Sequence, residues 1–152
     1  MGRIDENVKE YDIFLTPKYY IVRREKLPIK FLFQAKKLAP SILDELIEDS
    51  EDTSYVVYRD KDEWVFIAYN PKIIYDESIK IGLDPDNARS MYFAEQIRDR
   101  LKQPICLGDS ALAVVEGYVT LIPKSFAGEN GCKSIDVASL GLPKSYASAG
   151  KS

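Results

Sequence analysis

The sequence predicts an α/β protein of the α+β kind, in which a mixed and largely antiparallel sheet has helices packed on it. Three observations predict this class: short runs rich in β-branched and aromatic residues, helical segments with clear start and stop residues, and turn residues between them. The chain has 152 residues, 45% hydrophobic and 30% charged, which suits a single packed domain. We expect that domain over residues 1–123, divided into an N-terminal hairpin and helix (1–53) and a hairpin-helix-helix-hairpin subdomain (54–123). A Gly/Ser-rich tail follows over 124–152.

The first two strands are predicted to form a hairpin. Residues 12–15 and 19–24 are rich in β-branched and aromatic side chains. Pro17 lies between them and fits the first central position of a turn. A further strand is expected over residues 29–33.

Residues 34–47 are predicted to form an amphipathic helix, because apolar residues recur there at intervals of three and four. Pro40 lies inside this stretch. An interior proline costs about 3 kcal/mol, whereas a proline in the first helical turn costs little. We therefore expect the well-formed helix to begin at Ala39 or Pro40. The acidic run at 48–52 is expected to be a hydrated loop.

The clearest hairpin lies at residues 54–59 and 63–69, joined by a turn at 60–62. Both faces of both runs carry apolar residues, so we expect this pair in the interior of the sheet. Trp64, the single tryptophan, lies in the second run. An aromatic residue in such a strand belongs more often to the core than to a binding site.

Two helices are predicted after this hairpin. Asn70-Pro71 breaks the strand and opens a helix over 72–81, which Gly82 ends in a left-handed conformation. Asp84-Pro85 then fits the N-cap and first position of a second helix. That second helix is expected to carry an apolar stripe on a charged rod, with Glu95 and Arg98 as an ordinary i,i+3 pair. The stripe is formed by Ala88, Met91, Tyr92, Ala94, Glu95, Ile97, Arg98 and Leu101.

Another hairpin is predicted near the C-terminus. Residues 111–115 and 118–122 flank Glu116-Gly117, which favours a tight two-residue turn. A short strand at 105–107 precedes them. Glycine and serine then become frequent, so we expect a mobile tail with one short ordered piece near 135–140.

The charge distribution argues against a general nucleic-acid binder, because the net charge is −3 and the pI about 5.1. Basic residues do cluster over 18–30, interleaved with Tyr19 and Tyr20. An exposed basic edge strand explains this cluster. A phosphate-binding patch is the alternative.

Residue types that many enzymes need are few or absent. The chain contains no histidine, which excludes imidazole metal ligands and Ser-His or Cys-His nucleophiles within it. Cys106 and Cys132 make neither a disulfide framework nor a zinc site. We therefore expect a reducing compartment, with Cys106 as a small core residue. No apolar run is long enough to span a membrane and no secretory leader follows Met1, so we expect a cytosolic protein.

Phosphate cradles and metal-binding carboxylate clusters are not predicted. Gly150-Lys151-Ser152 matches only the end of a P-loop and lacks the strand and helix that such a loop needs. Acidic pairs such as Asp84 with Asp86 fit the capping of a helix N-terminus. We therefore expect no cofactor, no metal and no catalytic residue.

Three short stretches follow one another in a specific order and spacing over about residues 54–97. They are Ala68-Tyr69-Asn70-Pro71-Lys72, Ile81-Gly82-Leu83-Asp84-Pro85 and Tyr92-Phe93-Ala94. In this order the chain resembles the actin-like pilus-assembly proteins of the PilM type and the related GspL-type cytoplasmic domains. The resemblance implies a reduced actin-like architecture, similar to FtsA and PilM.

The same resemblance places residues 12–24 where such proteins carry their first phosphate-binding hairpin. Only Asp12 and Lys18 match that hairpin. The glycine after the aspartate is missing, and Pro17 lacks a backbone N–H that a phosphate would need. The hairpin is therefore interpreted as degenerate, which is similar to the GspL-type branch.

The resemblance implies a cytoplasmic scaffold or adaptor of a type IV pilus, competence or type II secretion platform. We expect it to be non-catalytic, because the chain is rich in aromatic residues and lacks catalytic groups. It would lie at the inner membrane through a membrane-anchored partner, whose peptide or strand would bind at a sheet edge. A homodimer is left open. Candidate partner-binding residues are mostly aromatic: Tyr19, Tyr20, Trp64, Tyr69, Asn70, Lys72 and Tyr92.

Two other functions are left open. One is a degenerate actin-like ATPase that uses Asp12 and Lys18. The other is a small-ligand-binding regulatory domain with a ferredoxin-like arrangement, which requires an enclosed apolar pocket near Trp64.

Overall fold

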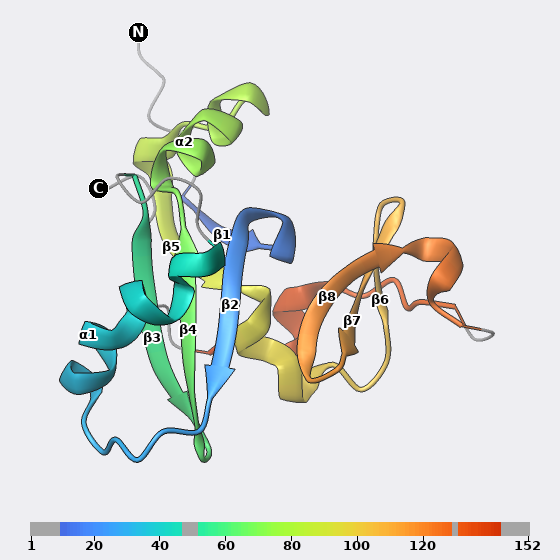
Figure 1. The fold of residues 1–152 in the computed structure, drawn as a ribbon. Helices are drawn as coiled ribbons and strands as arrows, with labels where there is room; N and C mark the ends of the chain where they lie inside the picture. Colours follow the sequence, from blue (N-terminus) through green and yellow to red (C-terminus); the bar gives the residue numbers. More distant parts are fainter. Residues whose placement is uncertain (1–9, 47–51, 129–130, 144–152) are drawn as a thin grey trace, which may run out of the picture.

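The computed structural model describes residues 10–46, 52–128 and 131–143, and these form a mixed α+β fold (Figure 1). The described strands make three small sheets, two of them antiparallel and one a parallel pair. The predicted fold class is confirmed. The single sheet that we expected is instead divided into three, which pack around a shared apolar cluster.

The central sheet has the order β2-β4-β3 and is antiparallel. It consists of β2 (Tyr20–Glu25), β3 (Ser54–Asp60) and β4 (Glu63–Tyr69). The β3–β4 hairpin is confirmed, with Asp60 opposite Glu63 beside a two-residue loop. The interior position is right for β4 but wrong for β3, which is an edge strand because β2 takes the other side of β4.

Helix α1 (Leu32–Leu43) covers one face of the central sheet, as Figure 1 shows. Its buried residues Ala35, Ala39 and Leu43 pack against residues of β3 and β4, among them Trp64 and Phe66. The prediction of a strand at 29–33 and of a helix start near Pro40 is wrong. Because the three buried side chains share one face only if the helix is continuous, tertiary packing outweighs the cost of the interior proline.

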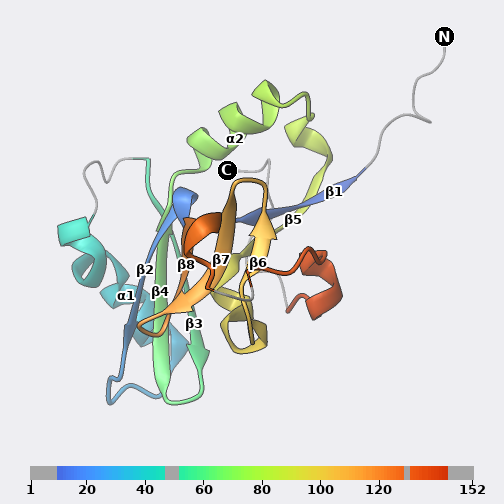
Figure 2. The same cartoon turned by 90° about the vertical axis from the view of Figure 1, so that its right-hand side faces the viewer.

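The expected hairpin of residues 12–24 is also wrong. Strand β1 (Tyr11–Leu15) pairs in parallel with β5 (Ala88–Phe93), while β2 pairs with β4. A 3-10 turn at Pro17–Tyr19 carries the chain out of the first pair into the central sheet (Figure 2). The proline fits this turn as it would fit a hairpin, so the local signal did not distinguish the two.

Helix α2 (Pro71–Lys80) begins and ends as predicted. The side chain of Asn70 accepts a hydrogen bond from the backbone N–H of Lys72 at 2.9 Å, which satisfies one free donor of the helix start. Gly82 follows with a φ of +86°, a conformation that residues with a Cβ rarely adopt.

The second predicted helix is wrong. Asp84 does cap a turn, because its side chain accepts from the Asp86 N–H at 3.0 Å, but the turn is a 3-10 helix of three residues. Strand β5 follows and then a 3-10 helix, η5 (Ala94–Arg100). Within β5, Met91 and Phe93 are both buried in the core, so the pattern that decides the structure has a period of two.

The third sheet has the order β6-β7-β8 and confirms the predicted C-terminal hairpin. It consists of β6 (Ile105–Leu107), β7 (Ser110–Val115) and β8 (Tyr118–Pro123). Glu116 and Gly117 form the turn with φ values of 52° and 87°, as a type I′ turn requires.

The Gly/Ser-rich segment is tied to the third sheet over its described part. Lys133 forms a parallel bridge with Ile105, and the short ordered piece expected near 135–140 is a 3-10 helix at Val137–Leu140. Cys106 is bonded to Cys132, which corrects the expectation of an unpaired core cysteine. Most of the acidic run at 48–52, and Gly150-Lys151-Ser152, lie outside the described residues.

Reduction of the Cys106–Cys132 disulfide is expected to lower the free energy of unfolding by about 2–4 kcal/mol, because the bond closes a loop of intermediate length. The two cysteines are 26 residues apart in the sequence. Denaturant titration with and without reductant measures the effect. A Cys106→Ser/Cys132→Ser variant should show no response to reductant, and an equal response in that variant would contradict the prediction.

Candidate functional site

Strand β3 offers an open edge of the central sheet. Asp60 and Glu63 flank the two-residue loop and are paired with each other. Along an antiparallel strand, the backbone N–H and C=O groups of successive residues point alternately toward the partner strand and away from it. The backbone N–H and C=O groups of Tyr55, Val57 and Arg59 therefore point away from β4. No strand among the described residues pairs with this side of β3.

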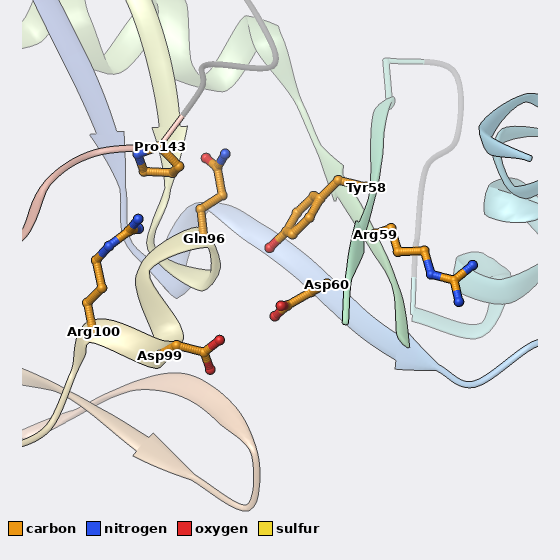
Figure 3. A pocket seen from close by; sticks show the side chains of 7 residues that line it. All are labelled: Tyr58, Arg59, Asp60, Gln96, Asp99, Arg100 and Pro143. Carbon is orange, nitrogen blue, oxygen red and sulfur yellow. The ribbon is translucent and has the colours of Figure 1, made fainter. Parts of the chain in front are cut away.

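A hollow of about 300 Å³ lies beside this edge (Figure 3). Three segments form it: the end of β3, helix η5 and the C-terminal part of the described chain. In Figure 3, Tyr58 and Asp60 point from β3 toward the η5 side, whereas Arg59 points to the opposite side of the strand. The lining residues are Tyr58, Arg59, Asp60, Gln96, Asp99, Arg100 and Pro143.

A buried ion pair positions η5 against the central sheet. Arg24 of β2 donates from Nε to the carboxylate of Glu95 and from Nη1 to Asp60 at 2.9 Å. Glu95 also accepts from the backbone N–H of Val119 in β8 at 3.0 Å. This cluster therefore joins the central sheet, η5 and the third sheet at one point.

The charged groups around the hollow influence one another. Burial raises the pKa of Glu95, while the Val119 N–H and Arg24 oppose that rise. Partial burial alone would raise the pKa of Asp99, but Lys61 and Arg98 hold it below its usual value. The hollow is thus lined by the carboxylates of Asp60 and Asp99 and by the exposed guanidinium of Arg100.

An open strand edge beside a polar hollow can hold an extended segment of another chain. The edge supplies backbone donors and acceptors, and the hollow can receive a side chain of that segment. The described residues contain no group of three acidic or cysteine side chains placed to hold a metal ion. Among the same residues, no helix has the length and apolarity that crossing a membrane requires.

Of the predicted partner-binding aromatics, Tyr20 and Trp64 are buried in the core, and Tyr69 is partly buried against it. Tyr20 and Tyr69 face each other across β2 and β4, and both rings contact Phe93, with centroid separations of 5.5 and 5.4 Å. Trp64 packs at the other end of β4 under α1 and is 3% exposed. Its indole N–H donates to the carbonyl of Ile29 at 3.1 Å, so this residue holds the loop before α1.

The remaining predicted residues are scattered over the surface. Asn70 caps α2, Lys72 is exposed on its first turn, and Tyr92 lies on β5 opposite Phe14. Tyr19 packs against the edge of the main core. The structure does not gather these residues at one place.

The residues of the alternative nucleotide site have other contacts. Asp12 binds Arg89 through both carboxylate oxygens, at 2.8 and 3.1 Å. The ammonium of Lys18 lies 5.6 Å from the ring centroid of Tyr19.

The residues of the hollow were missed because no local pattern connects them. Tyr58, Gln96 and Pro143 come from segments far apart in the sequence, and the pairing of Arg24 with Glu95 spans 71 positions. The one available signal was the polar Glu95 in a predicted apolar stripe. The sequence alone predicts only an ordinary i,i+3 pair of Glu95 with Arg98.

Comparison with known proteins shows the fold alone. No protein-family model matches the chain, and no curated protein sequence matches it. Its structure is similar to the cytoplasmic domain of EpsL, an inner membrane component of the type II secretion system of Vibrio cholerae, with a TM-score of 0.55 and 13% identity. The match covers 80% of this chain and 54% of that one, so the chain spans about half of that domain. This likeness agrees with the GspL-type part of the resemblance at the level of the fold.

Proposed function

We propose that this protein is a non-catalytic scaffold or adaptor of an inner-membrane secretion assembly. Its fold is similar to that of a type II secretion component, and this likeness favours a type II secretion platform over a type IV pilus or competence platform. The observation that carries the proposal is the open edge of β3 beside the hollow. A membrane-anchored partner binds there through an extended cytoplasmic segment.

The binding mode that we propose is strand addition. The segment pairs with the outward backbone groups of Tyr55, Val57 and Arg59, and one of its side chains enters the hollow next to Tyr58. Backbone hydrogen bonds supply affinity in this mode, and side-chain pockets supply specificity. Because carboxylates and Arg100 line the hollow, we expect a polar or charged side chain in it.

The proposed location is the cytoplasm, at the inner membrane through the partner. Thiols are kept reduced in that compartment, so Cys106 and Cys132 would be thiols in the cell, with their Cα atoms 5.1 Å apart. The disulfide would then form on oxidation. Neither alternative function is favoured by a specific observation: Trp64 is packed under α1, and Asp12 is bound to Arg89.

A proline at Tyr55 is expected to abolish binding of the partner segment. Proline removes one outward N–H of β3 and leaves the bonds to β4 intact, because an edge strand tolerates proline on its free side. The matched control is Tyr55→Ala, which loses the same ring but keeps the N–H. Cytoplasmic segments of inner-membrane secretion components from the same host are titrated into each protein by calorimetry.

The comparison between the two variants decides the proposal. Binding that survives in Tyr55→Ala and is lost in Tyr55→Pro, with both proteins folded by thermal melting, supports strand addition at β3. Equal binding in both variants rules out this edge. If none of the segments gives heat above dilution with the unmodified protein, the proposed function loses its support.

A further inference from the structure

The loop before α1 and the first half of that helix form a basic and aromatic tip, which we define as residues 26–38. Phe31, Leu32 and Phe33 follow one another in it and are 58%, 44% and 59% exposed. Three consecutive exposed apolar residues are unusual on a protein surface unless they contact something. The tip lies at the lower left of Figure 1, where the blue loop enters α1.

Positive charge surrounds these apolar residues. The tip contains four lysines and no acidic residue, although the whole chain carries a net charge of −3. All four lysines are exposed. Lys26 forms a solvent-exposed pair with Asp62 at 3.4 Å. The lysines are Lys26, Lys30, Lys36 and Lys37.

The stability of α1 does not explain this arrangement. The N-terminal end of a helix is its positive end and favours acidic residues, yet the first turn of α1 has none. Its N-cap is Phe31, which makes no capping hydrogen bond, although Ser, Thr, Asp or Asn is strongly preferred there. A helix start that lacks both acidic residues and a capping side chain is expected where function, and not the stability of the helix, determines the residues.

Hydrogen bonds from the central sheet also hold the tip in place. Trp64 Nε1 and Arg59 Nη1 each donate to the carbonyl of Ile29 at 3.1 Å, and the Arg59 guanidinium lies 5.1 Å from the Trp64 ring centroid. The rings of Phe31 and Phe33 stack at 5.9 Å. Because the loop is fixed before anything binds, little ordering entropy is lost on contact.

We propose that residues 26–38 dock directly on an anionic lipid surface. Phe31, Leu32 and Phe33 enter the boundary between headgroups and acyl chains, and the lysines lie at the level of the anionic headgroups. The exposed aromatic and aliphatic residues match the apolar boundary of such a surface. The lysine cluster, which has no acidic residue, matches its negative charge. The contact does not use the outward backbone groups of β3, so its failure would leave the partner-binding proposal untouched.

Flotation with lipid vesicles tests the proposal. We expect the protein to bind vesicles of equal parts phosphatidylglycerol and phosphatidylcholine, to ignore phosphatidylcholine alone, and to dissociate as salt is raised. One lysine near an anionic surface contributes about fivefold in affinity. Lys30→Glu/Lys36→Glu/Lys37→Glu should therefore weaken binding at least on the order of 100-fold. The control Lys72→Glu/Lys80→Glu/Lys102→Glu carries the same charge change elsewhere and should lose much less.

A second pair of variants tests the apolar contact. Phe31→Ser/Phe33→Ser should lose vesicle binding, whereas Ile79→Ser/Ile81→Ser, which removes apolar residues of similar exposure from the end of α2, should keep it. In a Phe33→Trp variant, vesicles should shift the emission to the blue over the constant signal of buried Trp64. All these positions are exposed, so thermal melting should show each variant folded.

Several results would overturn the proposal. The first is that the unmodified protein does not bind anionic vesicles at low salt. The second is an equal loss of vesicle binding in the tip variants and the control variants. The third is that vesicles cause no emission shift in the Phe33→Trp variant. Binding to polyglutamate but not to vesicles, lost with the three tip lysines, would assign the tip to an acidic protein and also reject the lipid surface.

Discussion

Replacement of Arg24 by methionine is expected to lower the free energy of unfolding by about 3–5 kcal/mol, because it leaves the carboxylate of Glu95 buried without its partner. The side chains of Arg24 and Glu95 are almost completely buried. Denaturant titration measures the loss. The control is Arg23→Met on the neighbouring position, whose side chain is exposed and pairs with Glu25.

The loss should depend on pH in a defined direction. Burial already raises the pKa of Glu95, and removal of the guanidinium raises it further. Below the pKa of an unfolded glutamate, about 4.3, Glu95 is protonated in both states and the variant keeps more of its stability. As the pH rises through the folded pKa, that stability is lost. The variant should therefore be relatively most stable in acid.

The double variant Arg24→Met/Glu95→Met separates an unpaired charge from a simple packing defect. If the loss in Arg24→Met comes from the orphaned carboxylate, removal of the carboxylate as well should recover most of the stability. A double variant that is as unstable as Arg24→Met, or a loss in Arg24→Met below about 1 kcal/mol, would contradict the assigned role. Because this pair joins η5 to the central sheet, its loss should also disturb the hollow beside β3.

The elements that the sequence predicts correctly are those whose signals lie within a few adjacent residues. The β3–β4 hairpin, the start and end of α2 and the Glu116-Gly117 turn are of this kind. In the β3–β4 hairpin, two apolar runs flank a short charged loop. At α2 and at the Glu116-Gly117 turn, a proline, glycine or capping side chain acts on backbone groups next to it. Such interactions do not depend on the rest of the fold.

The elements that the sequence does not predict depend on distant segments. Strand β1 pairs with β5 across more than 70 positions, and nothing in residues 12–15 identifies that partner. Pro40 stands inside α1 because three small or apolar residues must face the central sheet. Propensity is a weak prior that tertiary packing overrides.

The candidate site follows the same division. Aromatic richness identified side chains that the fold needs, since Tyr20 and Trp64 are core residues. The idea of a sheet edge was general enough to apply to β3, but the residues of the hollow come from three segments that only the fold brings together. The basic cluster over 18–30 includes Lys26 and Lys30, whereas the position of the lysines around exposed Phe31 and Phe33 depends on the fold.

Replacement of Phe93 by alanine is expected to cost about 3–5 kcal/mol of unfolding free energy, the usual range for a fully buried phenylalanine. Its ring is inaccessible to solvent and contacts both Tyr20 and Tyr69. A substitution at Phe93 distinguishes strand β5 from the expected helix, because Phe93 is buried in the strand but lies outside the apolar stripe of that helix. On a helix with that stripe the same substitution would cost little.

Tyr92→Ala is the matched control, since it removes a similar ring from the adjacent position. Neighbouring residues of a strand face opposite sides, and Tyr92 is only partly buried, so its loss should cost about 1 kcal/mol or less. Chemical denaturation of both variants gives the comparison. Equal losses at the two positions, or a larger loss at Tyr92, would contradict strand β5 and with it the parallel pairing of β5 with β1.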